Sequence, residues 1–247
     1  MSLSVRMAYL LAYAPILRIN SYPGEASLFD VIKPDDEDWG QATGFIRDTY
    51  ARAYGANVDT FMPKIMRVSN AAGEFRAVMG FRLAGQERLF LENYLDDPIE
   101  DVISRYLGKP VKRSEIIEVG NLAEAEPGDA RMALVGGTAY MRSLGCRWLV
   151  FTGVSRMRNV FRRLGLDIWE LMAADENMLP PEEVAKWGSY YQGNPVVCFG
   201  DIKQGHDILQ ELWATLRDTW AAAEEAGLKD AVCKDAVRKD AISVNYD

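Results

Sequence analysis

The chain has 247 residues and a net charge of −8, with 49% hydrophobic and 26% charged residues. This composition is typical of a folded globular protein with one large domain, with or without an appendage. The acidic balance argues against nucleic-acid binding, which needs basic groups to displace counterions, and a single histidine excludes a metal site built from several histidines.

Cysteine usage and hydropathy limit where the protein functions. Cys146, Cys198 and Cys233 are irregularly spaced, which argues against a disulfide framework and predicts a reducing, cytoplasmic location. No run of apolar residues reaches the length of about 20 that a membrane-spanning helix requires. The apolar segment 7–17 faintly resembles a signal peptide, but it is interrupted by Pro15. We expect it to be a strand or loop of the mature protein.

The first half of the chain alternates extended and helical patterns. Asp35 and Asp36 place negative charge where a helix begins, and aromatic and aliphatic residues then recur at helical spacing. Farther on, two β-rich runs flank a turn at 70–73, which predicts a hairpin. The expected elements are an extended segment at 8–33, a helix at 35–56, strands at 62–69 and 76–83, an extended segment at 89–94 and a helix at 98–107.

The middle of the chain has the clearest pattern. A strand is predicted at 114–123, a loop at 124–128, and a helix at 129–144 that Gly145 terminates. The nearly continuous apolar run 147–154 is typical of a strand buried on both faces. A short helix from Ser155 to Leu164 and a strand ending the segment 187–199 complete the expected elements.

From His206 onward the composition becomes helical. Lys229, Lys234 and Lys239 each begin a Lys-Asp-Ala sequence, and this five-residue step does not match the helical period of 3.6. The apolar positions therefore circle the helix. We expect a surface helix or a partly disordered tail, with a partner-binding helix as the alternative.

The loop between the strand 114–123 and the next helix has the features of an anion site. Gly128 allows close approach of a ligand to the main chain, and Ala130 is small. Unpaired amides at a helix start favour a phosphate, and Arg131 adds positive charge. A plain strand-to-helix connection explains the same residues equally well.

Four arginines cluster in the following helix of this otherwise acidic chain. They form either a solvated helix face or a basic rim for a phosphate-bearing cofactor or an acidic carrier protein. The sequence leaves both interpretations open. The four are Arg156, Arg158, Arg162 and Arg163.

These features together resemble a known family. The order of strand, Gly-containing loop, helix, apolar strand and Arg-Leu-Gly-Leu resembles the acyl-CoA-binding core of GNAT acyltransferases. The strings LFLENYLD, IIEVGNLA and WGSYY resemble more closely the thermostable hemolysin family, over roughly residues 35–200. That family is related in fold to the acyl-homoserine-lactone autoinducer synthases.

The resemblance implies an acyl thioester as the donor, either acyl-CoA or acyl carrier protein, and no permanently bound cofactor. Two central parallel strands would splay apart, and the pantetheine arm would pair with the strand 117–123. The loop 127–131 would hold the phosphates. The implied donor-binding residues are Val119, Leu122, Ala123, Gly128, Asp129, Ala130, Arg131, Asn159 and Arg162.

Glu118 is the candidate general base, which would accept a proton from an attacking amine. Its apolar neighbours favour a raised pKa. Alternation along the strand predicts that Glu118, Gly120 and Leu122 share one face and Val119, Asn121 and Ala123 the other. A half-exposed, ion-paired carboxylate is the alternative for Glu118. Asn121 is the second catalytic candidate, with a strand-end cap as its alternative.

The chain departs from the relatives at two places. Where many GNAT enzymes have a tyrosine acid, the sequence has Phe161, which has no proton to donate. Where the synthases show Glu-x-Ser-Arg-Phe, this chain keeps Glu118 but has Gly120, Asn121 and Leu122. Homoserine lactone is therefore not supported as the product.

The same resemblance suggests which residues bind the acceptor amine. The synthases use an N-terminal helix with an arginine and aromatics as a lid, and the strand 89–94 should border the pocket. The candidates for substrate binding are Arg47, Tyr50, Glu92 and Tyr94, with Trp187, Tyr190 and Tyr191 as the wall of an acyl chain and core packing as the alternative for the aromatics.

The expected fold is α/β (α+β), a GNAT-like three-layer arrangement with a mixed sheet of about seven strands, flanking helices, splayed central strands and a C-terminal helical extension. The expected domains are an acyltransferase domain at 1–205 and a helical extension at 206–247. The expected function is transfer of an acyl group to a small, amino-acid-like amine, without metal. A non-catalytic binding protein on the same fold and a membrane-active haemolysis factor are the alternatives.

Overall fold

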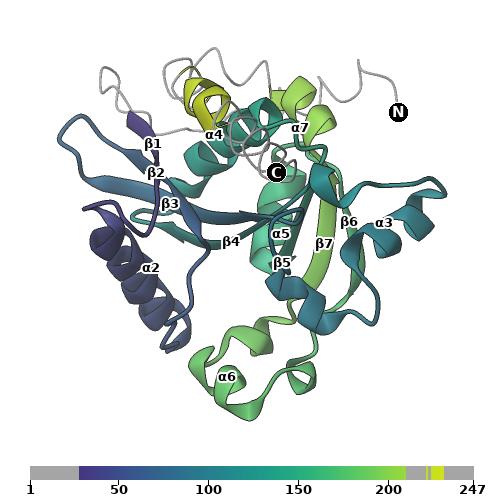
Figure 1. Cartoon of the computed structure of the whole chain (residues 1–247). Helices are drawn as coiled ribbons and strands as arrows, with labels where there is room; N and C mark the ends of the chain where they lie inside the picture. The colour runs from purple at the N-terminus through teal and green to yellow at the C-terminus, as the bar shows by residue number, and fades with distance from the viewer. Residues whose placement is uncertain (1–27, 210–220, 222–223, 231–247) are drawn as a thin grey trace, which may run out of the picture.

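A computed structural model describes residues 28–209, 221 and 224–230. Its centre is one mixed sheet with the strand order β1-β2-β3-β4-β5-β7-β6 (Figure 1). All neighbouring strands are antiparallel except β4 and β5, which run parallel. The strands are β1 (Leu28–Ile32), β2 (Lys64–Ser69), β3 (Phe75–Leu83), β4 (Ile116–Glu124), β5 (Trp148–Gly153), β6 (Ile168–Ala173) and β7 (Val196–Asp201).

Helices cover both faces of this sheet. The parallel pair β4 and β5 is connected through a helix, as a parallel connection requires. The helices are α2 (Trp39–Tyr54), α3 (Ile99–Leu107), α4 (Ala130–Ser143), α5 (Ser155–Arg163), α6 (Pro181–Lys186) and α7 (Ile202–Leu209), with 3₁₀ helices η1 (Phe90–Tyr94), η2 (Arg113–Glu115), η3 (Glu176–Met178) and η4 (Tyr190–Gly193).

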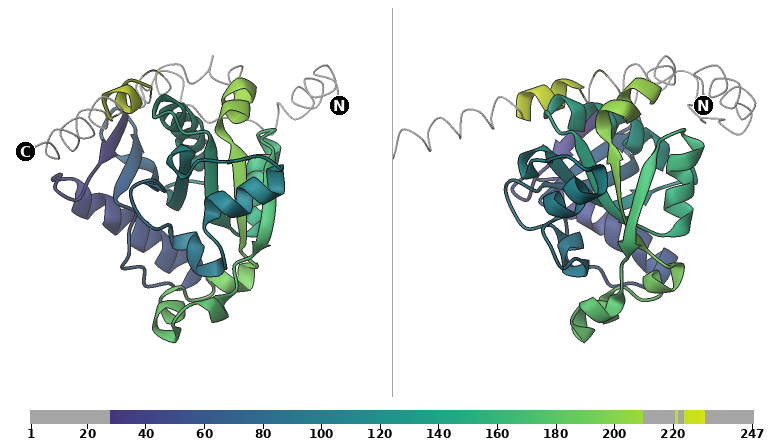
Figure 2. Two further views of the ribbon diagram at one scale, coloured as in Figure 1. Left: turned by 45° about the vertical axis from the view of Figure 1, so that its right-hand side comes forward. Right: turned by 90° about the vertical axis from the view of Figure 1, so that its right-hand side faces the viewer.

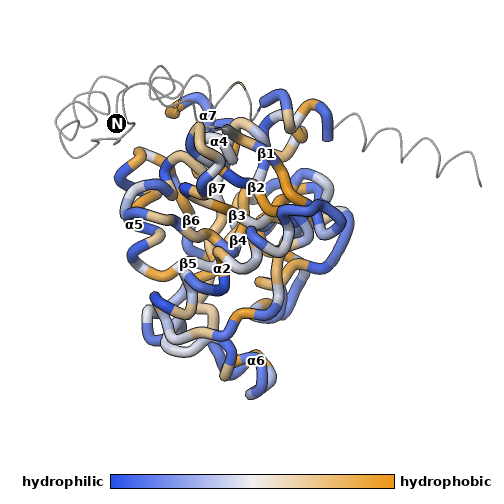
Figure 3. The backbone as a smooth tube through the Cα atoms, turned by 90° about the vertical axis from the view of Figure 1, so that its left-hand side faces the viewer, coloured by the Kyte–Doolittle hydropathy of each residue, from blue (hydrophilic) through white to orange (hydrophobic). Residues whose placement is uncertain are grey.

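Three groups of buried side chains define the layers. One lies between the sheet and α4, α5 and α7, and contains Ile117 and Phe151. On the opposite face, a second group joins the sheet to η1 and α3, and a third joins it to α2. Figure 2 shows the arrangement of the helices around the sheet from two further sides. Figure 3 shows the hydrophobic stretches concentrated in the strands. Helix, sheet and helix therefore form three layers, as expected from the sequence.

Most of the predicted elements are confirmed, and the segment 89–94 is the exception. It was expected to be extended, yet Phe90–Tyr94 forms the 3₁₀ helix η1. The carboxylate of Glu92 accepts the main-chain N–H of Leu89, and the carboxylate of Glu118 accepts the next two. These acceptors satisfy the donors that a sheet partner would otherwise bind, so the helical turn is stable.

The strand β6 was not predicted. It lies at the sheet edge, paired only with β7, and its side chains are half-buried or exposed. A strand in this position lacks the apolar alternation that would identify it in a sequence. It completes the seven strands expected for the sheet.

The described residues of the C-terminal segment are helical: 206–209 form the end of α7, and 224–230 pack on α4. A Cβ atom at Gly227 would lie 2.8 Å from the carbonyl oxygen of Tyr140, so only glycine permits this approach. Asp230 accepts hydrogen bonds from Tyr140 at 2.5 Å and Lys64 at 2.9 Å. The repeats at Lys234 and Lys239 and the N-terminal segment 7–17 lie outside the described residues.

No helix among the described residues combines the length and the apolar character needed to cross a membrane.

Candidate functional site

The centre of the candidate site is a divergence between β4 and β5. These strands pair only from Ile116 with Trp148 to Val119 with Phe151. Beyond this point β4 continues along β3 as far as Glu124, whereas β5 continues along β7. The facing edges of the two strands are therefore not hydrogen bonded to each other past Val119. The predicted splay is present.

A bulge at Asn121 shapes the β4 side of this divergence. Asn121 has φ of +48°, a left-handed conformation that asparagine tolerates better than most residues. The pairing with β3 shifts register between Val78 and Gly80. The Asn121 Oδ1 atom accepts the main-chain N–H of Met62 at 2.8 Å and so holds the loop before β2 against β4.

The bulge overturns the predicted alternation of side chains along β4. Leu122 packs with Val119 and Ile117 on the face covered by α4, although it was expected on the opposite face. Ala123 packs on the α2 face, although it was expected beside Val119. An extra residue in one strand reverses the orientation of every side chain after it, and the sequence pattern does not contain this information.

Glu118 is buried beside the start of the divergence, with 3% of its surface exposed. Its Oε2 atom accepts the N–H of Phe90 at 2.8 Å, and its Oε1 atom accepts the N–H of Leu91 at 2.9 Å. The nearest cation is Arg82, whose Nε lies 3.5 Å from Oε2. The carboxylate is thus fixed in position by η1.

Burial raises the pKa of Glu118 to about 7, although the two amide hydrogen bonds and the charge of Arg82 act in the opposite direction. Removal from water disfavours the charged form, and here this effect is larger than the local stabilisation. A carboxylate with this pKa is suited to accept and release protons near neutral pH.

Glu92 and Tyr94 lie on η1 but contact other parts of the protein. The Glu92 carboxylate binds Arg113 at 2.6 and 2.9 Å and accepts the N–H groups of Leu89 and Ile99. Burial opposes ionisation, but these bonds hold the pKa of Glu92 below its ordinary value. Its oxygens are therefore used in holding η1 and α3 together. The Tyr94 hydroxyl lies 2.6 Å from that of Tyr191.

The loop before α4 already contains an anion of its own. Gly128 has φ of +109°, as a glycine permits. The Oε2 atom of Glu124, the last residue of β4, accepts the N–H of Gly128 at 2.9 Å and the N–H of Ala130 at 3.1 Å. Its Oε1 atom lies 3.4 Å from the exposed guanidinium of Arg156. A carboxylate therefore occupies amides that were predicted to bind a phosphate.

Two further loop residues differ in their surroundings. Asp129 is buried, binds Arg76 at 3.0 Å and accepts the N–H of Glu126, so its carboxylate supports the loop. Arg131 is half-buried in the first turn of α4, and no ion pair of it is found in the part of the chain that the structure describes. Of the predicted loop residues, Arg131 is the one whose charge is available to a ligand.

The arginines of α5 divide into two groups. Arg158 is buried and binds the carbonyl oxygen of Gly153 at 2.6 Å and the carboxylate of Glu170 at 3.0 Å, which is a structural role. Arg156, Arg162 and Arg163 are exposed. Arg162 contacts Asn159 at 3.3 Å and Glu170 at 2.5 Å. The predicted basic rim therefore consists of three arginines.

Aromatic side chains meet at the open end of the divergence. The Tyr190 hydroxyl donates to the carbonyl oxygen of Thr152 on β5, at 3.2 Å. Burial raises the pKa of Tyr50, which interacts with the main chain of Leu122 on β4. Trp187 lies between the two, with ring centroids 6.2 Å from Tyr50 and 5.2 Å from Tyr190. Each wall of the divergence thus carries a tyrosine.

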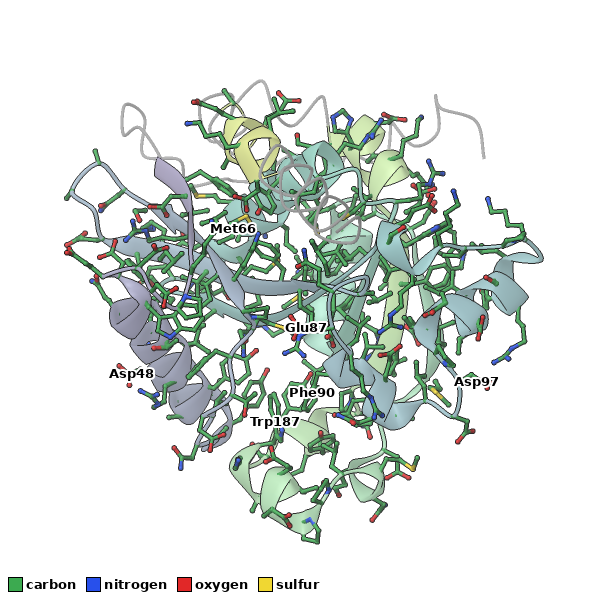
Figure 4. The ribbon with its side chains drawn as sticks, in the orientation of Figure 1. Asp48, Met66, Glu87, Phe90, Asp97 and Trp187 are labelled. Atoms are coloured by element: carbon green, nitrogen blue, oxygen red, sulfur yellow. The ribbon has the colours of Figure 1, made fainter. Side chains whose placement is uncertain are left out.

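These aromatics continue to η1. The ring centroids of Phe90 and Trp187 are 5.8 Å apart, and Figure 4 shows both residues below Glu87. Arg47 lies on the exposed side of α2, with its guanidinium 5.5 Å from the ring centroid of Phe61. The structure therefore brings Tyr50 and Tyr94 to the region of Glu118, whereas Arg47, on the exposed side of α2, makes no hydrogen bond or ion pair to this region within the described residues.

Arg82 is a residue of this region that the sequence pattern did not predict. It lies on β3 directly opposite Glu118 in the strand register. The available signal was a charged residue within the otherwise apolar segment 77–83. Strand register, which placed it beside Glu118, is set by long-range pairing.

The splayed parallel pair within a three-layer α/β arrangement defines a GNAT-like fold. The sequence profile of the thermostable hemolysin family matches residues 32–206, and the chain belongs to this family. No curated protein sequence matches the chain significantly.

Three solved structures are among those similar to this chain. FeeM, an N-acyl amino acid synthase from uncultured soil microbes, is 14% identical, with a TM-score of 0.53 over 76% of this chain and 97% of that one. Apo TofI is 16% identical, with a TM-score of 0.49 and coverages of 74% and 95%. MesI, a CoA-dependent acyl-homoserine lactone synthase, is 15% identical, with a TM-score of 0.46 and coverages of 75% and 95%.

Proposed function

We propose that this protein is an N-acyltransferase, which moves an acyl group from acyl-CoA or acyl carrier protein to a small, amino-acid-like amine. The observation that carries this proposal is the divergence of β4 and β5 beyond Val119 and Phe151. Main-chain groups on facing strand edges suit the amides of a pantetheine arm, because both partners offer donors and acceptors. The similarity of the fold to FeeM supports the same reaction class.

The donor would lie along β4. Its pantetheine would run beside the main chain of Val119, Leu122 and Ala123, and its phosphates would reach Gly128, Ala130 and Arg131. Positive charge for the phosphates comes from Arg131 and from the exposed Arg162 beside Asn159 on α5. Asp129 supports the loop through its bond to Arg76.

Donor binding requires two local displacements. The carboxylate of Glu124 has to leave the amides of Gly128 and Ala130, and Arg156 is the cation to which it is already paired. The hydroxyl of Tyr190 has to release the carbonyl oxygen of Thr152, if the pantetheine is to use that oxygen. Both movements are side-chain rotations.

In the proposed reaction the neutral amine attacks the thioester carbonyl carbon. A C–N bond forms, the C–S bond breaks, and the sulfur leaves as a thiolate. Glu118 accepts the surplus proton of the amine, directly or through water, and its pKa of about 7 suits this role. Phe161 offers no acid, but a thiolate is a weakly basic leaving group and departs without one. Asn121 can contribute its amide N–H groups, because its Oδ1 is bound to Met62.

The acceptor would approach Glu118 from the region of η1 and α2, where Tyr50 and Tyr94 lie. Trp187, Tyr190 and Tyr191 would line the acyl chain. Glu92 would act through η1, because its oxygens are already bonded. Arg47 would take part only if α2 moves.

The domain organisation and location form part of the same proposal. We propose an acyltransferase domain at 1–205 and an extension at 206–247, and the end of the family match at residue 206 supports this division. A cytoplasmic location would provide both classes of acyl donor.

Thiol release tests the proposal directly. Purified protein is mixed with acyl-CoAs of short, medium and long chain, or with acyl carrier protein, together with a panel of amines. We expect thiol release that depends on both donor and amine, an N-acyl product identified by mass spectrometry, and loss of both with Glu118→Ala. Binding of donors without any amine-dependent thiol release would instead identify a non-catalytic binding protein.

A further inference from the structure

Arg82 and Glu118 lie side by side at the centre of the candidate site. They face each other in the register of β3 and β4, and the Arg82 Nε lies 3.5 Å from the Glu118 Oε2. The Arg82 side chain is 14% exposed. The guanidinium of Arg82 is therefore partly accessible to solvent, whereas the neighbouring Glu118, the proposed base, is buried.

Among the described residues, no carboxylate is hydrogen bonded to the guanidinium of Arg82. Its Nε donates to the thioether sulfur of Met62 at 3.1 Å, and its Nη1 donates to the carbonyl oxygen of Arg88 at 3.1 Å. A thioether is a weak acceptor. Its carboxylate neighbours, Glu118 and Glu87, are both 3.5 Å away, and no hydrogen bond of Nη2 is found within the described ranges.

Five other buried or half-buried arginines are bound differently. Each holds a carboxylate oxygen within hydrogen-bond distance, between 2.5 and 3.0 Å. An arginine presents five N–H donors in a planar fork that fits a carboxylate. The N–H donors of Arg82 are not hydrogen bonded to any carboxylate of the described residues. The others are Arg67 with Asp38, Arg76 with Asp129, Arg113 with Glu92, Arg147 with Asp201 and Arg158 with Glu170.

The amides of η1 explain why the Glu118 carboxylate does not bind the guanidinium of Arg82 directly. They bind both oxygens of Glu118 at 2.8 and 2.9 Å and hold its carboxylate away from the guanidinium. The cation and the proton acceptor are thus adjacent, and no hydrogen bond joins them. A molecule with an amine and a carboxylate on neighbouring atoms matches this arrangement, its amine toward Glu118 and its carboxylate toward Arg82.

We propose that Arg82 binds the carboxylate of the acceptor, and that the acceptor is an α-amino acid. This inference rests on the proposed acyl transfer. The amine forms the C–N bond to the acyl carbon, the C–S bond breaks, and the surplus amine proton passes to Glu118. Arg82 takes no part in the proton transfer and determines which amines are accepted.

Matched acceptor pairs test this inference on the unmodified protein. Leucine is compared with 3-methylbutylamine, and phenylalanine with 2-phenylethylamine, by thiol release from one acyl-CoA. We expect kcat/KM to be about 10²–10³-fold higher for each amino acid, because the decarboxylated amine leaves the buried guanidinium unpaired. Equal rates within each pair would overturn the role of Arg82 and leave acyl transfer intact. Absence of thiol release with every amine would overturn acyl transfer itself.

Arg82 variants then separate binding from an effect through Glu118. Arg82→Gln is expected to raise the KM for the amino acid by about 10²-fold, with Arg82→Lys intermediate and the KM for the donor unchanged. The decarboxylated amines should lose much less, because they offer no carboxylate to Arg82, and their loss measures the effect of the Arg82 charge on Glu118. Loss of the same size for both members of a pair would mean that Arg82 acts on Glu118, and would overturn the inference.

Two controls keep the test interpretable. Arg105→Gln removes an exposed arginine paired with Asp97 and should leave all rates unchanged. Thermal unfolding followed by circular dichroism shows whether each variant is folded. If Arg82→Gln is not folded, competition on the wild-type protein replaces it. 4-Methylpentanoate should then compete with the leucine acceptor, and absence of competition would contradict the inference.

Discussion

The carboxylate of Glu124 accepts the main-chain N–H of Gly128 at 2.9 Å, across the turn that joins β4 to α4. An acidic side chain therefore occupies a position that a donor phosphate would need under the proposed function. A negative charge at a helix N-terminus is stabilising. The unliganded loop is thus stabilised by a group that competes with the ligand.

Removing this carboxylate should favour donor binding. For Glu124→Ala we expect the KM for acyl-CoA to fall about two- to fivefold, since a charge at a helix N-terminus contributes about 0.3–1 kcal/mol. The free energy of unfolding should fall by about 0.5–2 kcal/mol, because two amides of the loop lose their acceptor. Steady-state kinetics and urea denaturation measure the two effects.

Glu126→Ala is the matched control for this prediction. It removes the same charge from the same loop, but its exposed side chain does not bind the amides of Gly128 and Ala130. A change in KM of equal size in both variants would assign the effect to net charge. A rise in KM for Glu124→Ala would contradict the competition.

The raised pKa of Glu118 predicts the pH dependence of activity. A general base has to be deprotonated, so kcat/KM, calculated on the concentration of neutral amine, should rise with pH through about 7 and then level off. Glu118→Gln should lower kcat by about 10²–10⁴-fold and remove this inflection. A wild-type profile that is flat between pH 5 and 8 would contradict the assignment of the base.

The same carboxylate should make stability depend on pH. Its folded pKa of about 7 lies above the ordinary value of 4.5, so the folded state binds the proton more tightly than the unfolded state. The contribution of Glu118 is fully present below pH 4.5 and is lost as pH rises through 7. The Tm of Glu118→Gln relative to wild type should therefore increase between pH 5 and pH 8, as measured by calorimetry.

Arg158 and Arg163 should behave differently, although both belong to the predicted basic rim. Arg158 is buried and binds Gly153 and Glu170, so Arg158→Ala should destabilise the fold by about 1–3 kcal/mol, because the carbonyl oxygen of Gly153 loses its donor. Arg163 is exposed, and Arg163→Ala should change stability by less than about 0.5 kcal/mol. Urea denaturation of both variants measures this, and equal losses would contradict the structural role of Arg158.

The stability of the protein should depend on the acceptor oxygen of the Asn121 side chain. Asn121→Asp keeps an oxygen for the N–H of Met62, whereas Asn121→Ala removes it and places alanine at φ of +48°. We expect Asn121→Ala to lose about 2–4 kcal/mol of stability and Asn121→Asp to lose clearly less. Asn121→Gly, which relieves the backbone but lacks the oxygen, should fall between them. A stability of Asn121→Ala equal to that of wild type would show that the bulge does not depend on this bond.

The sequence by itself determined the order of the elements and the reaction class that we propose. Hydrophobic periodicity is a local property, and it was sufficient for the helix 35–56, the hairpin and the core segment from 114 to 164. The strings around Glu118 carried the family resemblance. Glu118 was also nominated as a base from its apolar neighbours alone, because those neighbours predict desolvation.

Only the tertiary structure decided which groups meet. The helical form of 90–94 depends on carboxylates from Glu92 and from Glu118, which is 26 residues farther along the chain than Glu92. The bulge at Asn121 and the register that brings Arg82 beside Glu118 arise from strand pairing. Hydrogen bonds between distant segments leave no periodic pattern in a sequence, so these features became visible only after the chain was folded.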